Sequence, residues 1–224
     1  GVSLVLFIFY LVRIQRLKHN FKIEKIRLNI ARDLHDDIGS TLGSINLLSK
    51  TASRKLDKHP VSEEISPIFN KISHSAESIL EAMDDIVWAI NPENDTMEKV
   101  IIRMKEFAAE ILEPLDIQYT FEEDGKFNMA RMDLNTRKEF FLIFKEALNN
   151  AAKYSGCSQV AIQLIRSDSG TRLIIKDNGS GFEPDLHHHG NGLKNMKHRA
   201  RDIHPELEIE SLTGKGTRIS IHIT

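Results

Sequence analysis

The sequence has little cysteine, few aromatic residues and almost no net charge. Its 224 residues include one cysteine, Cys157, which excludes a disulfide framework and fits a reducing compartment. Aromatic residues make up 7% of the chain, as in helix-rich soluble proteins. The 30 lysines and arginines nearly balance the 32 aspartates and glutamates, which argues against nucleic-acid binding. A P-loop motif is also absent from the sequence, so ordinary Walker-type NTPases are disfavoured.

An uncharged apolar run, VSLVLFIFYLV, opens the chain at residues 2–12. It is shorter than the roughly 20 residues that span a bilayer. Basic residues follow it, as at the cytoplasmic exit of a transmembrane helix: Arg13, Arg16, Lys18, Lys22 and Lys25. We therefore expect residues 1–12 to be the end of a truncated transmembrane helix and residues 13–22 to be a basic juxtamembrane linker. The alternatives are a buried core segment or a signal-peptide remnant, although signal peptides carry their charges before the apolar run.

Two long stretches then show helical periodicity. Residues 14–56 contain no proline, and the first break comes at residues 58–60, Lys-His-Pro. A second helical pattern starts near residues 62–64 and ends at Asn-Pro, residues 91–92. Two such helices form an antiparallel hairpin, which cannot bury both apolar stripes alone. Two copies packed as a four-helix bundle can, so residues 23–93 predict a homodimer.

The remainder of the chain, residues 94–224, alternates between helical and extended patterns. Helices are expected at residues 97–115, 136–154 and 192–203, and strands at 117–121, 160–165, 173–175, 207–209 and 218–223. This succession predicts an α+β fold, with helices on one face of a mixed sheet.

One histidine stands out in the first helix. Residues 32–39 read RDLHDDIG, which puts His35 at the edge of the apolar stripe and two carboxylates directly after it. An imidazole held on a rigid helix and presented to a partner suits a nucleophile, whereas an isolated histidine is more often simply solvated. Gly39 and Gly43 are predicted on the same outward face, where they would keep the surface low for a partner. Close helix packing is the alternative explanation for these glycines.

The helix predicted at residues 136–154 carries the first of four short signals, EALNNAAK at residues 146–153. Glu146 and Asn150 lie four positions apart and therefore point from one helix face. Their oxygens can hold Mg²⁺ directly or through water, and Lys153 can reach a phosphate. A solvated surface pair is the alternative.

Three glycine-containing signals follow along the chain. Residues 177–181, DNGSG, come straight after an apolar strand. A carboxylate there can accept a hydrogen bond from the adenine amine, and the glycines allow the backbone to come close to a ligand. The alternative is a simple turn. Residues 190–196, GNGLKNM, open a helix whose free N–H groups can bind phosphate. Residues 214–217, GKGT, precede the last strand and equally fit a hairpin turn. Each signal alone is weak, but their order and placement are specific.

With these motifs in this order, the chain resembles a sensor histidine kinase of the subgroup whose dimerisation helix carries an Arg-Asp-Leu-His-Asp motif. Its second half is similar to the ATPase domain shared with Hsp90, MutL and gyrase. In that comparison residues 146–153 match the N box, and residues 177–181, 190–193 and 214–217 match the G1, G2 and G3 boxes. The resemblance covers nearly everything after residue 22.

The resemblance implies a role for each site residue. His35 would be the phosphoacceptor, and Asp36 would orient its imidazole and take its proton. Glu146 would sit near Mg²⁺ and the γ-phosphate, with Asn150 as a metal ligand, and Asp177 would bind adenine. The further positions that would bind ATP are Lys153, Gly179, Gly181, Gly190, Gly192, Leu193, Gly216 and Thr217.

The resemblance also implies an activity and a location. It indicates a homodimeric kinase anchored in the inner membrane of a bacterium, with residues 13–224 in the cytoplasm and a sensor region upstream. With ATP and Mg²⁺, it would phosphorylate His35 and pass the phosphoryl group to an aspartate of a response regulator. Residues 182–189 would form the ATP lid.

Two other functions fit parts of the sequence, and one residue departs from the family pattern. An ATP-driven conformational clamp of the Hsp90 class is disfavoured by His35 on a dimer hairpin. A silent dimeric signalling scaffold is disfavoured by the intact Asn150 and Asp177 and by the glycines. Many relatives carry glutamine five residues after the histidine, whereas this chain has Ser40, which makes phosphatase activity uncertain.

Overall fold

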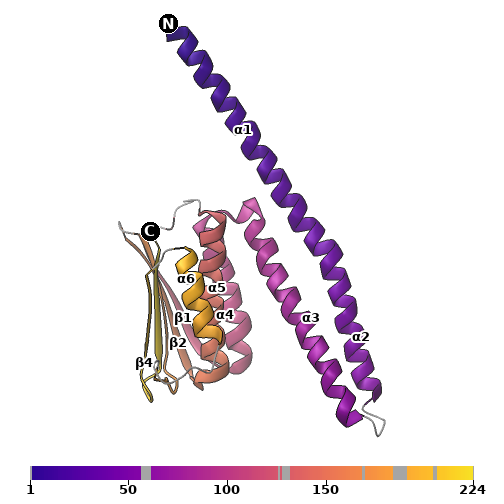
Figure 1. The fold of residues 1–224 in the computed structure, drawn as a ribbon. Coiled ribbons are helices and arrows are strands. Elements are labelled where there is room, and N and C mark those ends of the chain that lie inside the picture. Colours follow the sequence, from indigo (N-terminus) through magenta and orange to yellow (C-terminus); the bar gives the residue numbers. More distant parts are fainter. Residues whose placement is uncertain are drawn as a thin grey trace. The chain divides into compact units, whose positions relative to one another are not determined.

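The chain divides into two compact units, residues 1–94 and 95–224. The computed structural model describes residues 2–56, 62–125, 127, 132–167, 170–183, 191–203 and 206–223. Figure 1 shows long helices in the first unit and a sheet covered by helices in the second.

The first unit is a helical hairpin. Helix α1 (Val2–Asp33) continues through a π-helical turn (Leu34–Gly39) into α2 (Ser40–Leu56), and α3 (Ser62–Ile90) runs back beside α2 (Figure 1). The predicted antiparallel hairpin is confirmed, but the π-helical turn was not expected from the periodicity. Among the helices of the described residues, none combines the length and the apolar character needed to cross a membrane.

Small and polar side chains fill the interior of the hairpin. The buried residues of this unit are Ala31, Ser49, Ser53, Ser73, Ala76, Met83, Asp85 and Ala89. Between α2 and α3, Ser73 Oγ donates to Asn46 Oδ1 at 2.7 Å, and Lys50 Nζ donates to Glu77 Oε1 at 2.5 Å. Polar pairs of this kind favour one register of the two helices over others.

Large apolar side chains remain exposed on the outside of the hairpin. Five isoleucines are between 38% and 51% exposed: Ile38, Ile45, Ile72, Ile79 and Ile86. They recur every seven residues along each arm, which is the spacing of a seam between packed helices. The hairpin by itself therefore leaves an apolar stripe on each arm uncovered.

The second unit begins after a short 3₁₀ turn (Pro92–Asn94) and has the predicted α+β composition. Its elements in chain order are α4 (Met97–Leu112), a 3₁₀ turn (Glu113–Leu115), β1 (Gln118–Asp124), α5 (Leu134–Asn150), a π-helical turn (Ala151–Ser155), β2 (Gln159–Ser167), β3 (Gly170–Asp177), α6 (Asn191–Asp202), β4 (Glu206–Ser211) and β5 (Thr217–Ile223). Helix α4 is shorter than expected because Pro114 lies in the 3₁₀ turn that follows it.

The sheet has five strands in the order β1-β2-β3-β5-β4. Strands β1 and β2 are parallel because the chain crosses through α5 between them, and the other neighbours are antiparallel. Figure 1 shows α4, α5 and α6 on one face of the sheet, as predicted. Asp177, the last residue of β3, pairs with Val160 at the start of β2, so the adenine-binding candidate lies at a sheet end.

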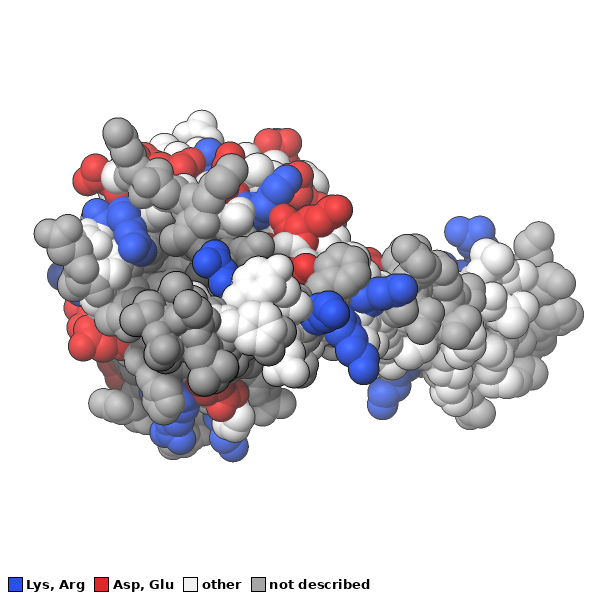
Figure 2. Space-filling model, turned by 90° about the horizontal axis from the view of Figure 1, so that it is seen from above, with Lys and Arg blue, Asp and Glu red and all other residues white. Residues whose placement is uncertain are grey.

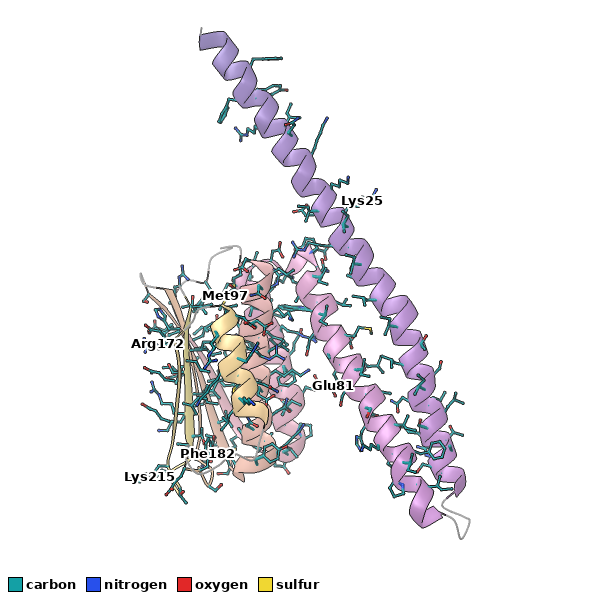
Figure 3. All side chains as sticks on the ribbon, in the orientation of Figure 1. Lys25, Glu81, Met97, Arg172, Phe182 and Lys215 are labelled. Carbon is teal, nitrogen blue, oxygen red and sulfur yellow. The ribbon has the colours of Figure 1, made fainter. Side chains whose placement is uncertain are left out.

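The core of this unit lies between the helices and the sheet, where Figure 3 shows side chains filling the space. Alternate strand residues are buried there, among them Ile162, Leu164, Leu173, Ile175 and Ile221. From the helices, the rings of Phe107 and Phe141 meet edge to face with centroids 6.1 Å apart. This packing holds α5, which carries the N box, firmly against the sheet.

Charged side chains of both signs share the surface. On the face turned to the viewer in Figure 2, lysines and arginines are interspersed with aspartates and glutamates. Exposed ion pairs include Arg218 with Glu210 at 3.0 Å and Lys105 with Glu123 at 2.5 Å. Such pairs contribute about 1 kcal/mol or less each, so burial in the core dominates the stability of the unit.

Candidate active site

Helix α5 places the N-box side chains. Its N-terminus is capped by Asp133, whose Oδ1 accepts hydrogen bonds from the N–H groups of Asn135 and Thr136, both at 3.0 Å. A cap of this kind contributes about 1 kcal/mol. The buried face of the helix is apolar except for Arg137 and Glu139, and Glu146 and Asn150 remain half-buried at its C-terminal end. The predicted i, i+4 pair is therefore available to a ligand.

The start of α6 meets this pair. A Cβ atom added to Gly192 would overlap Oε1 of Glu146 and would lie 3.5 Å from Nδ2 of Asn150. The carboxylate and the amide therefore face the first turn of α6, where free N–H groups are expected. A side chain at residue 192 would collide with the Glu146 carboxylate, which gives a physical reason for glycine in the G2 box.

Lys153 lies in the π-helical turn that follows α5. Residues 151–155 form this turn, which ends at Gly156 with φ +63°. Lys153 is exposed, and Tyr154 beside it is 77% exposed. A wider turn shifts Lys153 from the position that regular α-helical spacing predicts. Its long stem leaves the ammonium free to reach an anion.

Asp177 is a buried acid at the end of β3. It is 7% exposed, and its Oδ1 accepts a hydrogen bond from the N–H of Gly179 at 2.8 Å. Burial raises the pKa of Asp177 above its ordinary value, although the backbone N–H groups of Gly179 and Thr217 act against this rise. A buried carboxylate of this kind is suited to accept a hydrogen bond from a ligand amine, because pairing offsets part of its desolvation.

The glycines of the G1 and G3 boxes bring protein backbones together. An added Cβ would overlap Ser155 O at Gly179, Leu212 O at Gly181 and Asp177 O at Gly216. Gly181 and Gly216 also have positive φ values, +59° and +81°. The sequence suggested room for a ligand beside these glycines, whereas in the structure protein atoms occupy the space beside them. Their effect is to bring the G1 and G3 boxes and the π-helical turn after α5 into close contact.

The turn at residues 214–217 is also a hairpin turn, since it joins antiparallel β4 and β5. The N–H of Gly214 donates to Ser180 O at 2.6 Å, so this turn is bonded directly to the G1 box. Figure 3 shows Phe182 and Lys215 at the same end of the sheet, in agreement with that contact. Thr217 and Leu193 are both half-buried.

Several predicted site residues fall outside what the structure describes. These are the side chains of His35, Asp36 and Ser40, together with Gly190 and residues 184–189 of the expected lid. The backbone of His35 lies in the π-helical turn Leu34–Gly39. Near it, a Cβ on Gly39 would lie 3.2 Å from Cε of Met83 on α3, so Gly39 faces α3 as a close-packing site. Gly43 is exposed, with open space beside it.

The structure adds residues that the sequence did not suggest. Asn178 accepts hydrogen bonds from the N–H groups of Ser158 and Gln159, both at 3.0 Å, and so ties the end of β3 to the start of β2. Ser155 O accepts from the N–H of Ser180 at 2.8 Å, which joins the π-helical turn after α5 to the G1 box. Arg137 and Glu139 are charged residues at buried positions of α5. Such residues are seldom buried without partners, so charges on the buried side of this helix are a sequence signal that ion-pair partners lie elsewhere in the chain.

The donor set suits a nucleotide with Mg²⁺. Among the described residues no three His, Cys, Asp or Glu side chains form a metal cluster. Mg²⁺ in proteins commonly takes one or two side-chain oxygens and completes its shell with phosphate and water, which a Glu146–Asn150 pair can supply. The absence of a side chain at Gly192 leaves room for the Glu146 carboxylate beside the first turn of α6, with the Asn150 amide next to it.

Two family models match the chain. One, described as histidine kinase, matches residues 27–95, and the other, described as histidine kinase-, DNA gyrase B- and HSP90-like ATPase, matches residues 135–224. Together the two matches support a two-component histidine kinase with an ATPase domain of this type. The ATPase match contains the N, G1, G2 and G3 boxes, and the histidine kinase match contains His35, so the kinase also has a nucleotide-binding domain of the ATPase type.

Curated relatives agree with this assignment. Sensor histidine kinase LiaS of Bacillus subtilis is 28% identical over 208 residues, which cover 90% of this chain and 54% of that protein. Signal transduction histidine-protein kinase/phosphatase UhpB of Salmonella typhimurium is 24% identical over 203 residues, covering 89% of this chain and 39% of that protein. The chain thus spans about 26% to 55% of the length of the curated relatives that it matches.

Solved structures share the fold at low sequence identity. The histidine kinase domain from the Erythrobacter litoralis EL346 blue-light activated histidine kinase aligns with a TM-score of 0.51 at 18% identity, covering 82% of this chain and 94% of that one. Full-length ShkA, solved in complex with AMPPNP, aligns with a TM-score of 0.53 at 14% identity, covering 89% of this chain and 45% of that one.

Proposed function

We propose that this chain transfers the γ-phosphoryl group of ATP to His35 and then passes it to an aspartate of a response regulator. The observation that carries the proposal is the meeting of three residues from two helices at one place. Glu146 and Asn150 at the end of α5 face Gly192 at the start of α6. Phosphoryl transfer depends mainly on positioning and charge neutralisation. This arrangement contributes to positioning, and its two side-chain oxygens would hold the Mg²⁺ that, with Lys153, would neutralise the phosphates.

Each residue of the site has a separate task in this proposal. Asp177 accepts the adenine amine, and the exposed ammonium of Lys153 attracts the phosphates. Asn150 offers a neutral oxygen to the metal, and Glu146 acts near the transferred group. Mg²⁺, when bound, supplies positive charge that offsets the charge of the phosphates. Asp36 orients the imidazole of His35 and takes its proton.

The proposal includes a homodimer. The exposed isoleucines on α2 and α3, such as Ile45 and Ile79, lie on apolar stripes that the hairpin leaves uncovered. A second copy would bury both stripes in a four-helix bundle, which is the packing that the seven-residue spacing favours.

A membrane anchor and an upstream sensor also belong to the proposal. The apolar residues 2–12 precede the basic residues 13–22, and the relatives named sensor kinases are longer than this chain. We place the anchor in the inner membrane of a bacterium, with the catalytic units and the response regulator on its cytoplasmic side.

Labelling with γ-labelled ATP tests the central step. Wild type is expected to acquire an acid-labile, base-stable label, and His35→Gln is expected to lose it while still binding ATP. His74→Gln is the matched control, because His74 is exposed on α3 and the substitution is the same. Retention of the label in His35→Gln would remove His35 from the reaction. Hydrolysis of ATP without any protein label would favour an ATP-driven clamp instead.

A further inference from the structure

Polar contacts tie the C-terminal half of α6 to α5, at residues that take no part in the proposed chemistry. Arg199 Nη1 donates to Glu139 Oε2 at 2.7 Å, and Asn135 Nδ2 donates to Asp202 O at 3.2 Å. The other end of α6 begins beside Glu146, at Gly192. Residue numbers therefore rise along α6 where they fall along α5, and the two helices run antiparallel.

The two contact points lie at equal distances along both helices. Gly192 and Arg199 are two turns apart on α6, and Glu146 and Glu139 are two turns apart on α5, about 10.5 Å in each case. The ion pair at one end thus determines which residue of α6 faces Glu146 at the other. A slip of one turn would move that residue by about 5.4 Å.

Apolar packing alone determines this register poorly. Helix α6 has 12 residues, a length that is marginal for an isolated helix, and its buried side chains are Met196 and Ala200. Hydrophobic contacts are non-directional, so they tolerate sliding. A charge-assisted bond between a guanidinium and a carboxylate requires a defined geometry, so it resists sliding.

Glu139 is well placed to hold this bond. Its side chain is 5% exposed, while that of Arg199 is 34% exposed. Burial acts to raise the pKa of Glu139, but hydrogen bonds from Lys138 and Arg199 outweigh it, and the pKa lies below its ordinary value. Lys138, at 2.9 Å, is the neighbour of Glu139 on α5. Arg199 is therefore the partner that links Glu139 to a second helix.

We propose that the Glu139–Arg199 ion pair is a positioning clamp that holds the first turn of α6 at Glu146. The inference rests on the proposed kinase function, because the clamp matters for catalysis only if Glu146 and Gly192 belong to the nucleotide site.

Arg199→Gln tests the clamp, with Arg201→Gln as the matched control. Both changes remove a guanidinium from α6, but Arg201 is exposed, whereas Arg199 is bonded to the buried Glu139. In Arg199→Gln we expect faster hydrogen exchange of α6 amides and about a tenfold slower labelling of His35 at saturating ATP, since small misplacements are costly for transfer. Arg201→Gln is expected to behave like wild type in both measurements.

Two further variants separate a positioning role from general destabilisation. Glu139→Gln combined with Arg199→Gln should be no slower than the more affected single variant, because both remove one interaction. Arg199→Lys keeps the charge but loses the planar fork, so it should fall between wild type and Arg199→Gln. Additive losses in the double variant would overturn the clamp, as would equal losses in Arg199→Gln and Arg201→Gln.

Hydrogen exchange is measured without turnover, so it distinguishes failure of the clamp from failure of the kinase function. If wild type never labels His35 but Arg199→Gln loosens α6, the clamp stands and the kinase function fails. If wild type labels His35 and Arg199→Gln matches it in labelling and exchange, the clamp is overturned and the kinase function stands.

Discussion

Replacing Gly192 with alanine adds one methyl group at the point where α6 meets Glu146. The new Cβ would overlap Oε1 of Glu146 but would lie at an ordinary contact distance, 3.5 Å, from Nδ2 of Asn150. The overlapped atom is the far end of a flexible side chain, so the carboxylate can turn away while both helices stay in place. The substitution therefore displaces one predicted catalytic group and leaves the predicted metal ligand nearly undisturbed.

The size of the effect follows from this displacement. To restore van der Waals contact, the Glu146 carboxylate must retreat by about 1 Å. A misplacement of that size costs on the order of a hundredfold in rate, which corresponds to about 2.7 kcal/mol of activation free energy. ATP affinity should change far less, because Asp177 and Lys153 are not touched by the added methyl group.

Phosphorylation of His35 at saturating ATP gives the rate, and titration with a fluorescent ATP analogue gives the affinity. Asn195→Ala is the matched control, since Asn195 is exposed on α6 and the change to alanine also raises helix propensity. It should label at the wild-type rate. Wild-type labelling by Gly192→Ala would refute the reasoning, because the position of the Glu146 carboxylate would then be irrelevant to transfer.

Three other substitutions test separate parts of the molecule. Asp177→Asn should lose the preference for ATP over GTP in binding titrations, because an amide can present a donor where the carboxylate accepts the adenine amine, and equal weakening for both nucleotides would contradict the adenine role. Asp95→Asn should lower the free energy of unfolding in urea by about 3 kcal/mol, because it breaks the pair with the fully buried Arg137. Glu210→Gln, in the exposed pair with Arg218, should lower it by less than about 1 kcal/mol. Equal losses would show that burial does not decide the cost. Ser40→Gln should speed the dephosphorylation of a purified phospho-regulator, since a longer amide reaches further toward an attacking water, and a slower rate than wild type would assign Ser40 another role.

Local patterns in the sequence predicted most of the fold. Helical periodicity located the hairpin, and strict alternation located β5, because both depend on which residues face a core. The G1, G2 and G3 signals were placed correctly at a strand end, a helix start and a hairpin turn, since glycine and aspartate favour those conformations locally. These features are encoded by residues close together in the chain.

Contacts between distant residues were beyond the reach of such patterns. The partners of Arg137 and Glu139, Asp95 and Arg199, are 42 and 60 positions away along the chain. The sequence could identify Gly179 and Gly216 as positions of close approach. It could not identify the group that approaches them, because a sequence does not say which backbone lies opposite. The sequence suggested a ligand, and the structure places Ser155 and Asp177 there.

The two π-helical turns are the clearest departure from periodicity, and both coincide with residues expected to carry chemistry. One covers Leu34–Gly39 and includes His35, and the other covers Ala151–Ser155 and includes Lys153. A π turn is less favourable than the α-helix and occurs frequently at functional sites. Each turn shifts one residue out of the α-helical pattern while the helix before it keeps its packed face. The same periodicity that located these helices therefore gives the wrong direction for Lys153, which lies within the second turn.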